Sequence, residues 1–294
     1  MKLAAIDIGS NAVRLQIVRV NEIGSAERFK KIEFVRIPIR LGDDAFKEQW
    51  ISKEKRKLFM QAMTSFKALL QAFEVDHYLA CATSAMREAK NGKKIVKKVE
   101  EEIGLKIHII NGKKESELIL ASILHIFEEN KNYLTIDVGG GSTEMTIISN
   151  QKIINSVSFD IGTVRLMDGA VSEKTWQTIE HWVQHKTSGL EPMLAVVTSG
   201  TINKILGLLH PNQVVKSISR TELKDFHRKV SKMSLQERVE KYKLNMDRAD
   251  IIDVSADIYL RILNWAGVKT ILSPDNSGLK DGMLHVLYQK FHQQ

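Results

Sequence analysis

Three consecutive glycines, 139–141, separate two apolar stretches of this sequence and are flanked by two carboxylates, Asp137 and Glu144. Glycine leaves the backbone N–H groups uncovered, and a turn made of such groups forms a concave site that suits an anion such as phosphate. Two carboxylates beside a phosphate site favour a cation between them, because all three groups are negatively charged. The pattern therefore predicts phosphate chemistry assisted by a divalent metal ion.

The same pattern occurs near the N-terminus, where residues 6–18 read IDIGSNAVRLQIV. A shift of 130 positions lays this segment on residues 136–148, so that Asp7 meets Asp137. A single Asp-Gly turn is typical of an ordinary hairpin, but two copies and a triple glycine favour a functional site. A repeat at the spacing of a domain predicts two similarly folded halves, each offering a glycine-rich hairpin to a shared cleft.

Two side chains outside the hairpins could take part in the same chemistry. Arg87 follows the predicted strand 77–82, at the end of a strand where α/β sheets bind ligands. Its guanidinium matches phosphate geometry, although a surface arginine in the first turn of a helix is an equal alternative. Glu115 begins a predicted helix over residues 115–129, where a carboxylate can also serve merely as a partner of the helix dipole. Glu117 must point to another flank of that helix.

Alternation and helical periodicity predict the elements that position these groups. In the first half we expect strands over residues 3–8, 13–20, 28–39, 77–82 and 106–110, a turn at 40–44, and helices over 53–73, 95–103 and 115–129. In the second half we expect a hairpin within 133–148, strands over 152–159, 194–198 and 268–272, and helices over 176–186, from about 203, over 221–233, 234–242 and 247–266, and from about 279. Ser234 and Glu237 carry the signature of a capping box.

Composition indicates an ordinary globular protein. The chain has 294 residues, 43% hydrophobic and 27% charged, which is enough for two domains of about 150 residues, each with its own core. The sequence contains no apolar run of roughly 20 residues and enters a strand without a leader, so we expect a cytoplasmic protein with no membrane partner. Cys81 lies in an apolar run and is expected in the core, while His181 and His185 have metal-ligand spacing but lack a third ligand.

The charge of the chain favours an anionic partner. The net charge is +8 and the pI is near 9.3. Few aromatic residues and no recognition module accompany this charge, so nucleic-acid binding would rest on charge alone and is not expected. The partner that we expect is a polyanionic phosphate substrate.

Six segments, in this order and spacing, resemble the exopolyphosphatase/guanosine pentaphosphate phosphohydrolase (Ppx/GppA) family over essentially the whole chain: IDIGSNAVRL, ATSAMREA, INGKKESELI, IDVGGGSTE, FDIGTVRL and LSPDNSGLKDGML. The resemblance implies an α/β fold of two ribonuclease-H-like domains, of the actin/Hsp70/sugar-kinase superfamily, around a central cleft. It implies domain I over residues 1–129, joined by a C-terminal helix at about 284–294, and domain II over residues 130–283.

The resemblance also assigns roles to residues. In that family the two Asp-Gly hairpins hold phosphates and a divalent ion. This implies phosphate binding by Gly9, Ser10, Asn11, Gly139, Gly140, Gly141, Ser142 and Thr143. It implies Mg²⁺, or another divalent cation, near Asp7, Asp137 and Glu144. The family arginine matches Arg87, and the family's catalytic glutamate, which would activate the attacking water, matches Glu115.

The implied activity is hydrolysis of a phosphoanhydride bond, with release of terminal orthophosphate from inorganic polyphosphate. Short chains are expected, because the long helical C-terminal extension of larger members is lacking. A pppGpp 5'-phosphohydrolase, a kinase or ATPase of the wider superfamily, and a non-hydrolytic sensor of polyphosphate or an alarmone remain alternatives, and a homodimer stays open.

The sequence departs from the pattern of the resembled family at several places, and residues 199–201 carry one glycine where many members have two. Ala12 stands where serine is usual, and Lys280 occupies the usual position of an arginine. Lys114 and Glu117 replace the usual Glu and Arg around Glu115, which reverses the local charge at both places. These departures leave hydrolysis as the expectation and the choice of substrate open.

Overall fold

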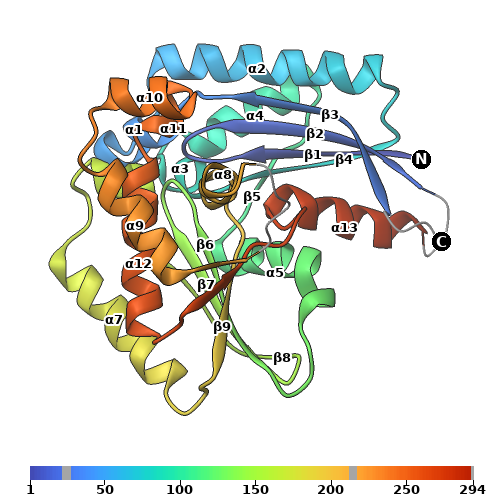
Figure 1. Cartoon of the computed structure of the whole chain (residues 1–294). Helices are drawn as coiled ribbons and strands as arrows, with labels where there is room; N and C mark the ends of the chain where they lie inside the picture. Colours follow the sequence, from blue (N-terminus) through green and yellow to red (C-terminus); the bar gives the residue numbers. More distant parts are fainter. Residues whose placement is uncertain (22–27, 212–216, 293–294) are drawn as a thin grey trace. The chain divides into compact units, whose positions relative to one another are not determined.

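The computed structural model describes residues 1–21, 28–211 and 217–292, except for the side chain of His292 (Figure 1). The chain divides into two compact units. Unit 1 comprises Met1–Ser122 and the C-terminal helix α13 (Leu279–His292), and unit 2 comprises Ile123–Gly278. The sequence-based domain bounds were 1–129 and 130–283, so the last helix joins unit 1 from an earlier residue and the boundary falls earlier in the chain.

The sheet of unit 1 has the strand order β3-β2-β1-β4-β5. Its strands are β1 (Lys2–Ile8), β2 (Val13–Val20), β3 (Phe29–Ile37), β4 (His77–Ala82) and β5 (His108–Ile109). The first three strands form an antiparallel meander, and β4 then pairs parallel with β1. Parallel pairing requires a crossover, which here contains α1 (Leu41–Glu48) and α2 (Lys53–Ala72).

The sheet of unit 2 repeats this topology, with the order β10-β11-β9-β6-β7-β8. Its strands are β6 (Asn132–Val138), β7 (Thr143–Ser149), β8 (Lys152–Phe159), β9 (Met193–Val197), β10 (Ser217–Ser219) and β11 (Thr270–Leu272). Here β6, β7 and β8 form the meander and β9 pairs parallel with β6. The predicted pair of similarly folded α/β halves is therefore confirmed.

Helices cover both faces of the sheet in unit 1. Alternate residues of β1 face opposite ways, and both sets are apolar. Ala4, Ile6 and Ile8 pack with α2 and with α4 (Gly92–Ile103). Leu3 and Ala5 pack with α5 (Gly112–Ile123) and α13 on the other face. Figure 1 shows α2 and α13 on opposite sides of these strands.

Helices of unit 2 pack on its sheet around a larger core. The longest are α7 (Glu173–Thr187), α9 (Arg220–Val230) and α12 (Ile252–Trp265), which bury apolar side chains against β6 and β9. Shorter helices complete the unit: α6 (Thr163–Met167), α8 (Gly200–Leu209), α10 (Leu235–Tyr242) and α11 (Met246–Ala249). In the described part of the chain, no helix combines the length and apolarity needed to cross a membrane.

Several local predictions are confirmed. Ser234 and Glu237 form the predicted capping box at the start of α10. Gly104 ends α4 in the left-handed conformation, at φ 69°. Cys81 is buried, and burial, with the nearby charges of Asp7 and Glu115, raises the pKa of its thiol to about 12. This thiol stays protonated at neutral pH and belongs to the core.

Other predictions are wrong where a distant segment decides the backbone. The predicted turn at residues 40–44 is the beginning of α1, because backbone N–H groups of Arg40 and Gly42 donate to carbonyls of the first hairpin. The predicted helix over 247–266 is broken between α11 and α12. Nη1 of Arg238 donates a hydrogen bond to the carbonyl of Ala249, the last residue of α11, at 3.1 Å. This side chain therefore satisfies a carbonyl at the point where the helix is interrupted. The short strand β10 and the earlier starts of α5 and α8 were not predicted either.

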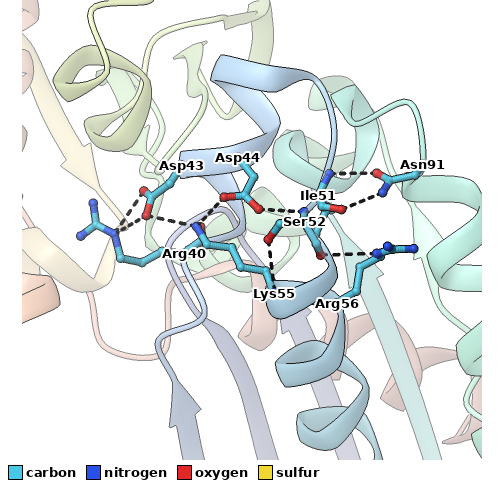
Figure 2. A network of polar contacts seen from close by, with 8 residues as sticks. All are labelled: Arg40, Asp43, Asp44, Ile51, Ser52, Lys55, Arg56 and Asn91. Atoms are coloured by element: carbon cyan, nitrogen blue, oxygen red, sulfur yellow. Dashed lines mark hydrogen bonds and ion pairs between the residues drawn. The ribbon is translucent and has the colours of Figure 1, made fainter.

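A polar network fixes α1 to the start of α2 (Figure 2). The Asp44 carboxylate accepts the backbone N–H of Ser52 at 2.8 Å, and it pairs with Nζ of Lys55 at 3.1 Å. Ser52 is also the N-cap of α2, since its side chain accepts the N–H of Lys55. Burial acts to raise the pKa of Asp44, but the hydrogen bonds from Ser52 and the Lys55 charge outweigh it, so that the pKa is lowered.

We predict that Asp44→Asn destabilises the fold at pH 7 by about 1–2 kcal/mol, the scale of a lost charged hydrogen bond. A carboxyl whose pKa is lowered on folding adds stability above its unfolded pKa of about 3.9, and this stability is lost as the pH falls through the folded pKa. Urea unfolding of both proteins at pH 7 and pH 3 measures the effect. The difference in unfolding free energy should shrink at pH 3, and a constant difference would show that the charge of Asp44 does not matter.

Candidate active site

The triple-glycine turn joins β6 to β7 and is held by the start of α6. The N–H of Gly139 donates to the Ser142 carbonyl at 2.9 Å, which closes the turn. Three donors then bind the carbonyls of the glycines at 2.8–3.0 Å: Thr163 N–H to Gly139, Val164 N–H to Gly140, and Arg165 Nε to Gly141. All three carbonyls therefore point toward α6.

This arrangement decides where the N–H groups of the turn point. In a planar trans peptide, the carbonyl of one residue and the N–H of the next point in opposite directions. The N–H groups of Gly140, Gly141 and Ser142 therefore point away from α6. Three successive N–H groups on one side of a turn suit an anion, and the phosphate binding predicted from the glycines stays a prediction. We call these three groups the unit 2 cradle.

Gly162 allows α6 to come this close. A Cβ atom at Gly162 would stand 2.5 Å from the Gly140 carbonyl carbon and 2.5 Å from the Gly141 nitrogen. The hydroxyl of Thr143, which is fully buried, donates to the Ile161 carbonyl at 2.7 Å and so holds the same segment. Thr143 thus supports the turn, and its phosphate-binding role stays a prediction.

Asp137 and Glu144 stand beside the cradle as a pair of carboxylates. They are register partners on β6 and β7, and such partners present their side chains on the same face. Asp137 accepts a hydrogen bond from the Thr198 hydroxyl at 2.5 Å, and Glu144, which is buried, accepts one from the Ser158 hydroxyl at 2.8 Å. Two neighbouring anions repel each other, and a cation between them relieves that repulsion.

The donor set fits a hard divalent cation. Mg²⁺ is typically held in proteins by one or two carboxylates, together with substrate phosphates and water. Asp137 and Glu144 supply two carboxylates next to a predicted phosphate site. Among the described residues, no cluster of three or more His, Cys, Asp or Glu side chains has the geometry of a metal site.

Two residues of this site were missed by sequence reasoning. Thr198 directly follows β9, and the small residues 199–201 that come next were the available signal. Tyr259 lies on α12, and its hydroxyl donates to the Ser199 hydroxyl at 3.0 Å and accepts the Val138 N–H at 3.3 Å. Complete burial, and then the charge of Asp137, raise the pKa of Tyr259. Its spacing in the sequence is that of an ordinary core aromatic residue.

The first hairpin, in unit 1, is built in the same way. The N–H of Gly9 donates to the Ala12 carbonyl at 3.1 Å. The carbonyls of Ser10 and Asn11 accept N–H groups from the start of α1, at 2.8 and 2.9 Å. The following N–H groups, of Asn11 and Ala12, therefore point away from α1. The Ser10 hydroxyl lies 2.9 Å from the hydroxyl of Ser84, the first residue of α3 (Ser84–Glu88). The segment that follows β4 therefore also supports this turn.

The two hairpins differ in charge at one pair of positions. In unit 1 the register partner of Asp7 is Arg14, and Nη1 of Arg14 lies 2.6 Å from the Asp7 carboxylate. The 130-residue shift lays Arg14 on Glu144, so the equivalent pair in unit 2 carries two negative charges. Asp7 thus has a guanidinium beside it, whereas Asp137 and Glu144 place two carboxylates side by side, and metal binding at all three residues stays a prediction.

Glu115 is buried in the first turn of α5. Its backbone N–H donates to the Asn111 carbonyl at 3.0 Å, and Asn111 also accepts the Lys114 N–H through its side chain at 2.8 Å. Glu115 lies near Cys81, which is the register partner of Asp7. The fold of unit 1 thus brings Glu115 and the first Asp-Gly hairpin to the same end of the sheet.

Arg87, the predicted phosphate clamp, contacts the segment that leads into α5. Its Nη1 donates to the Ile110 carbonyl at 2.8 Å. This bond ties α3 (Ser84–Glu88) to the end of β5, one residue before Asn111. Arg87 therefore helps to position the helix that carries Glu115, and phosphate binding by this residue stays a prediction.

Comparison with known proteins identifies the family of this chain. The family model described as "Ppx/GppA phosphatase family" matches residues 20–291. The chain belongs to the Ppx/GppA phosphatase family. A bifunctional 3-dehydroquinate synthase/phosphatase of Fusobacterium nucleatum is 26% identical over 98% of this chain and 47% of its own length. A guanosine-5'-triphosphate,3'-diphosphate pyrophosphatase of Photobacterium profundum is 22% identical over 98% of this chain and 59% of its own length. The chain thus spans about half the length of these curated relatives.

Solved structures of the Ppx/GppA family share the fold. An exopolyphosphatase from Cytophaga hutchinsonii superimposes with a TM-score of 0.84, at 21% identity, covering 99% of this chain and 98% of the other. This likeness confirms the predicted actin-like architecture of two α/β domains.

One departure from the Ppx/GppA pattern has a structural account. Lys114 and Glu117 form an ion pair at 3.1 Å on the exposed side of α5. Both charges are reversed relative to the pattern expected for the family, and in this chain the two reversed charges pair with each other. Glu117 is exposed and points away from the buried Glu115, as the sequence predicted. This exchange therefore leaves the position of Glu115 unaffected.

The C-terminal helix holds α5 in place through a glycine. A Cβ atom at Gly282 would stand 1.6 Å from the Leu118 carbonyl oxygen, so α13 crosses α5 with the two backbones in contact. Next to it, the buried Asp281 accepts from Lys280 at 2.6 Å and from Gln16 at 3.1 Å. The last of the six motifs, LSPDNSGLKDGML, thus holds α5, the helix that carries Glu115, against the sheet.

We predict that Gly282→Ala destabilises unit 1 by about 1–3 kcal/mol, because the added methyl group must push α5 away from α13. In a helix interior, alanine is by itself about 1 kcal/mol more favourable than glycine. A net loss of stability in Gly282→Ala would therefore come from the steric clash. Gly207→Ala is the matched control, since Gly207 lies in α8 with open space at its Cβ position. Guanidinium unfolding of both variants should separate them, and equal stabilisation would contradict the proposed packing.

Proposed function

We propose that this protein hydrolyses a terminal phosphoanhydride bond of inorganic polyphosphate and releases orthophosphate. The observation that carries the proposal is the unit 2 cradle beside the carboxylates of Asp137 and Glu144. In phosphoryl transfer, the main tasks of a protein are to position the transferred group and to stabilise its charge. Three N–H donors next to a site for a cation suit both tasks.

Each group has a role in this proposal. The N–H groups of the cradle bind the terminal phosphate, and the first hairpin and Arg87 bind neighbouring phosphates. Asp137 and Glu144 would hold Mg²⁺, which when bound would neutralise charge on the phosphate oxygens. Glu115 accepts a proton from a water molecule as this water attacks the terminal phosphorus. The bond from that phosphorus to the bridging oxygen breaks, and the shortened chain leaves.

A second candidate substrate is pppGpp, which ends in the same phosphoanhydride chemistry. The relative from Photobacterium profundum favours it, because that protein is described as a guanosine-5'-triphosphate,3'-diphosphate pyrophosphatase. The same cradle and the same glutamate would serve both substrates. Polyphosphate and pppGpp differ only beyond the terminal phosphoanhydride bond, in the phosphate chain or the nucleotide that is left after hydrolysis. The rates of phosphate release from the two substrates must therefore be compared.

One assay tests the proposal: phosphate release from short polyphosphate, long polyphosphate, pppGpp and ATP, each with and without Mg²⁺. We expect release from short polyphosphate that depends on Mg²⁺ and exceeds release from ATP. Faster release from pppGpp would move the assignment to the second candidate. Tight binding of polyphosphate without release of phosphate would identify a sensor, and transfer of phosphate from ATP to a sugar or protein would identify a kinase.

A further inference from the structure

Unit 1 contains a cavity of about 570 Å³ that the proposed function does not use. Residues of β4, β5, α5 and α13 line it. Its volume lies in the range of pockets that bind small molecules. Among the described residues that line it, none is a residue proposed above for catalysis or phosphate binding.

The walls of this cavity are largely apolar. Ile110 contributes from the residue after β5, Leu118 from α5, and Val286 and Leu287 from α13. Phe291 stacks on the ring of His77, with ring centroids 3.6 Å apart and planes 2° from parallel. Burying an apolar ligand here would release water from these walls and is therefore favourable.

Two lysines and one acid are the charged groups of the lining. Lys114 stands on α5 and Lys290 stands on α13. The single acid of the lining, Asp76, accepts the backbone N–H of Lys2 at 2.7 Å. Within the described part of the chain, Lys290 has no acidic partner and lies 5.1 Å from the centre of the Phe291 ring. A ligand would meet an apolar interior and a positive rim.

Glu117, the ion-pair partner of Lys114, would compete only weakly with an anionic ligand for the Lys114 ammonium group. The ion pair between Lys114 and Glu117 is about half exposed at both side chains. Exposed pairs of this kind contribute only about 0–1 kcal/mol. Lys114 can therefore turn to an anionic group in the cavity at little energetic cost.

We infer that this cavity is a binding site for an amphipathic anion, with an apolar chain in the interior and one acidic head group between Lys114 and Lys290. The inference does not depend on the proposed hydrolysis. It rests on the match of the cavity to such a ligand in size, apolar walls and charge.

Dodecanoate is the probe, used below the concentration at which it forms micelles, with isothermal titration calorimetry on the full chain. The cationic analogue dodecyltrimethylammonium has the same chain length and the opposite charge. We expect dodecanoate to bind one site, with at least about tenfold higher affinity than the cation. Absence of dodecanoate binding, or equal binding of both amphiphiles, would overturn the inference.

Two variants locate the site. Val286→Trp fills the interior and should abolish binding, while Lys290→Glu reverses a rim charge without filling the cavity and should weaken binding by about tenfold. Lys97→Glu is the control, since Lys97 lies exposed on α4 and outside the lining. Amide hydrogen exchange should slow in α5 and α13 when dodecanoate binds the natural protein. Unchanged affinity in Lys290→Glu, with no protection of these helices, would place any binding elsewhere.

Discussion

Glu115→Gln is expected to lower kcat for phosphate release by about 10²–10⁴-fold, the usual contribution of a general base. Glutamine keeps the size and the first-turn position of the side chain but cannot accept the proton of the attacking water. The cradle of unit 2 and Asp137 are unchanged, so polyphosphate should still bind. Stopped-flow release of phosphate gives kcat, and calorimetric titration with short polyphosphate gives the dissociation constant.

Glu117→Gln is the matched control for this experiment. Glu117 lies two residues further along α5, exposed and paired with Lys114, and both variants remove one negative charge from the same helix. Only the loss of Glu115 should affect turnover. Near-normal kcat in Glu115→Gln would remove this residue from the role of base, and equal losses in both variants would indicate an effect of helix charge alone.

Gly162→Ala is expected to disrupt the cradle and to lower kcat/KM for polyphosphate by roughly 10- to 100-fold for each lost hydrogen bond to phosphate, since bonds to charged groups contribute about 1.5–3 kcal/mol. The added Cβ would stand 2.5 Å from backbone atoms of Gly140 and Gly141, which cannot rotate away as a flexible side chain could. Its φ of −157° suits any residue, so the clash is the only obstacle. Steady-state kinetics on short polyphosphate measures the loss.

Gly200→Ala is the control for Gly162→Ala. Gly200 begins α8 after the N-cap Ser199, and its Cβ position is open. The same chemical change close to Thr198 should therefore leave kcat/KM almost unchanged. If Gly162→Ala retained full kcat/KM while remaining folded, the orientation of the cradle by α6 would be contradicted.

The sequence by itself determined the features that depend on short-range pattern. The repeated Asp-Gly hairpins, the alternating strands and the capping box at Ser234 follow from residue types within a few positions, because dihedral preference and hydrophobic periodicity act locally. The burial of Cys81 follows from an apolar run of the same kind. The internal repeat then predicted two equivalent halves, and their matching strand orders bear this out.

Only the tertiary structure decided how these parts support each other. The start of α1 depends on carbonyls of Ser10 and Asn11, and the break before α12 depends on Arg238. Gly162 and Gly282 lie in two of the six motifs, but the sequence does not show that each permits a backbone contact with a segment far along the chain. Such contacts leave no periodic signal, because they involve a single position and a partner that only folding brings near.

The triple glycine shows the same division. Its residue types predicted an anion site, since they leave N–H groups uncovered. The side of the turn to which these groups point was decided by Thr163, Val164 and Arg165, which hold the opposing carbonyls. Local composition thus predicted an anion site in the turn, and packing against α6 decided its direction, because a planar peptide whose carbonyl is held on one side must present its N–H on the other.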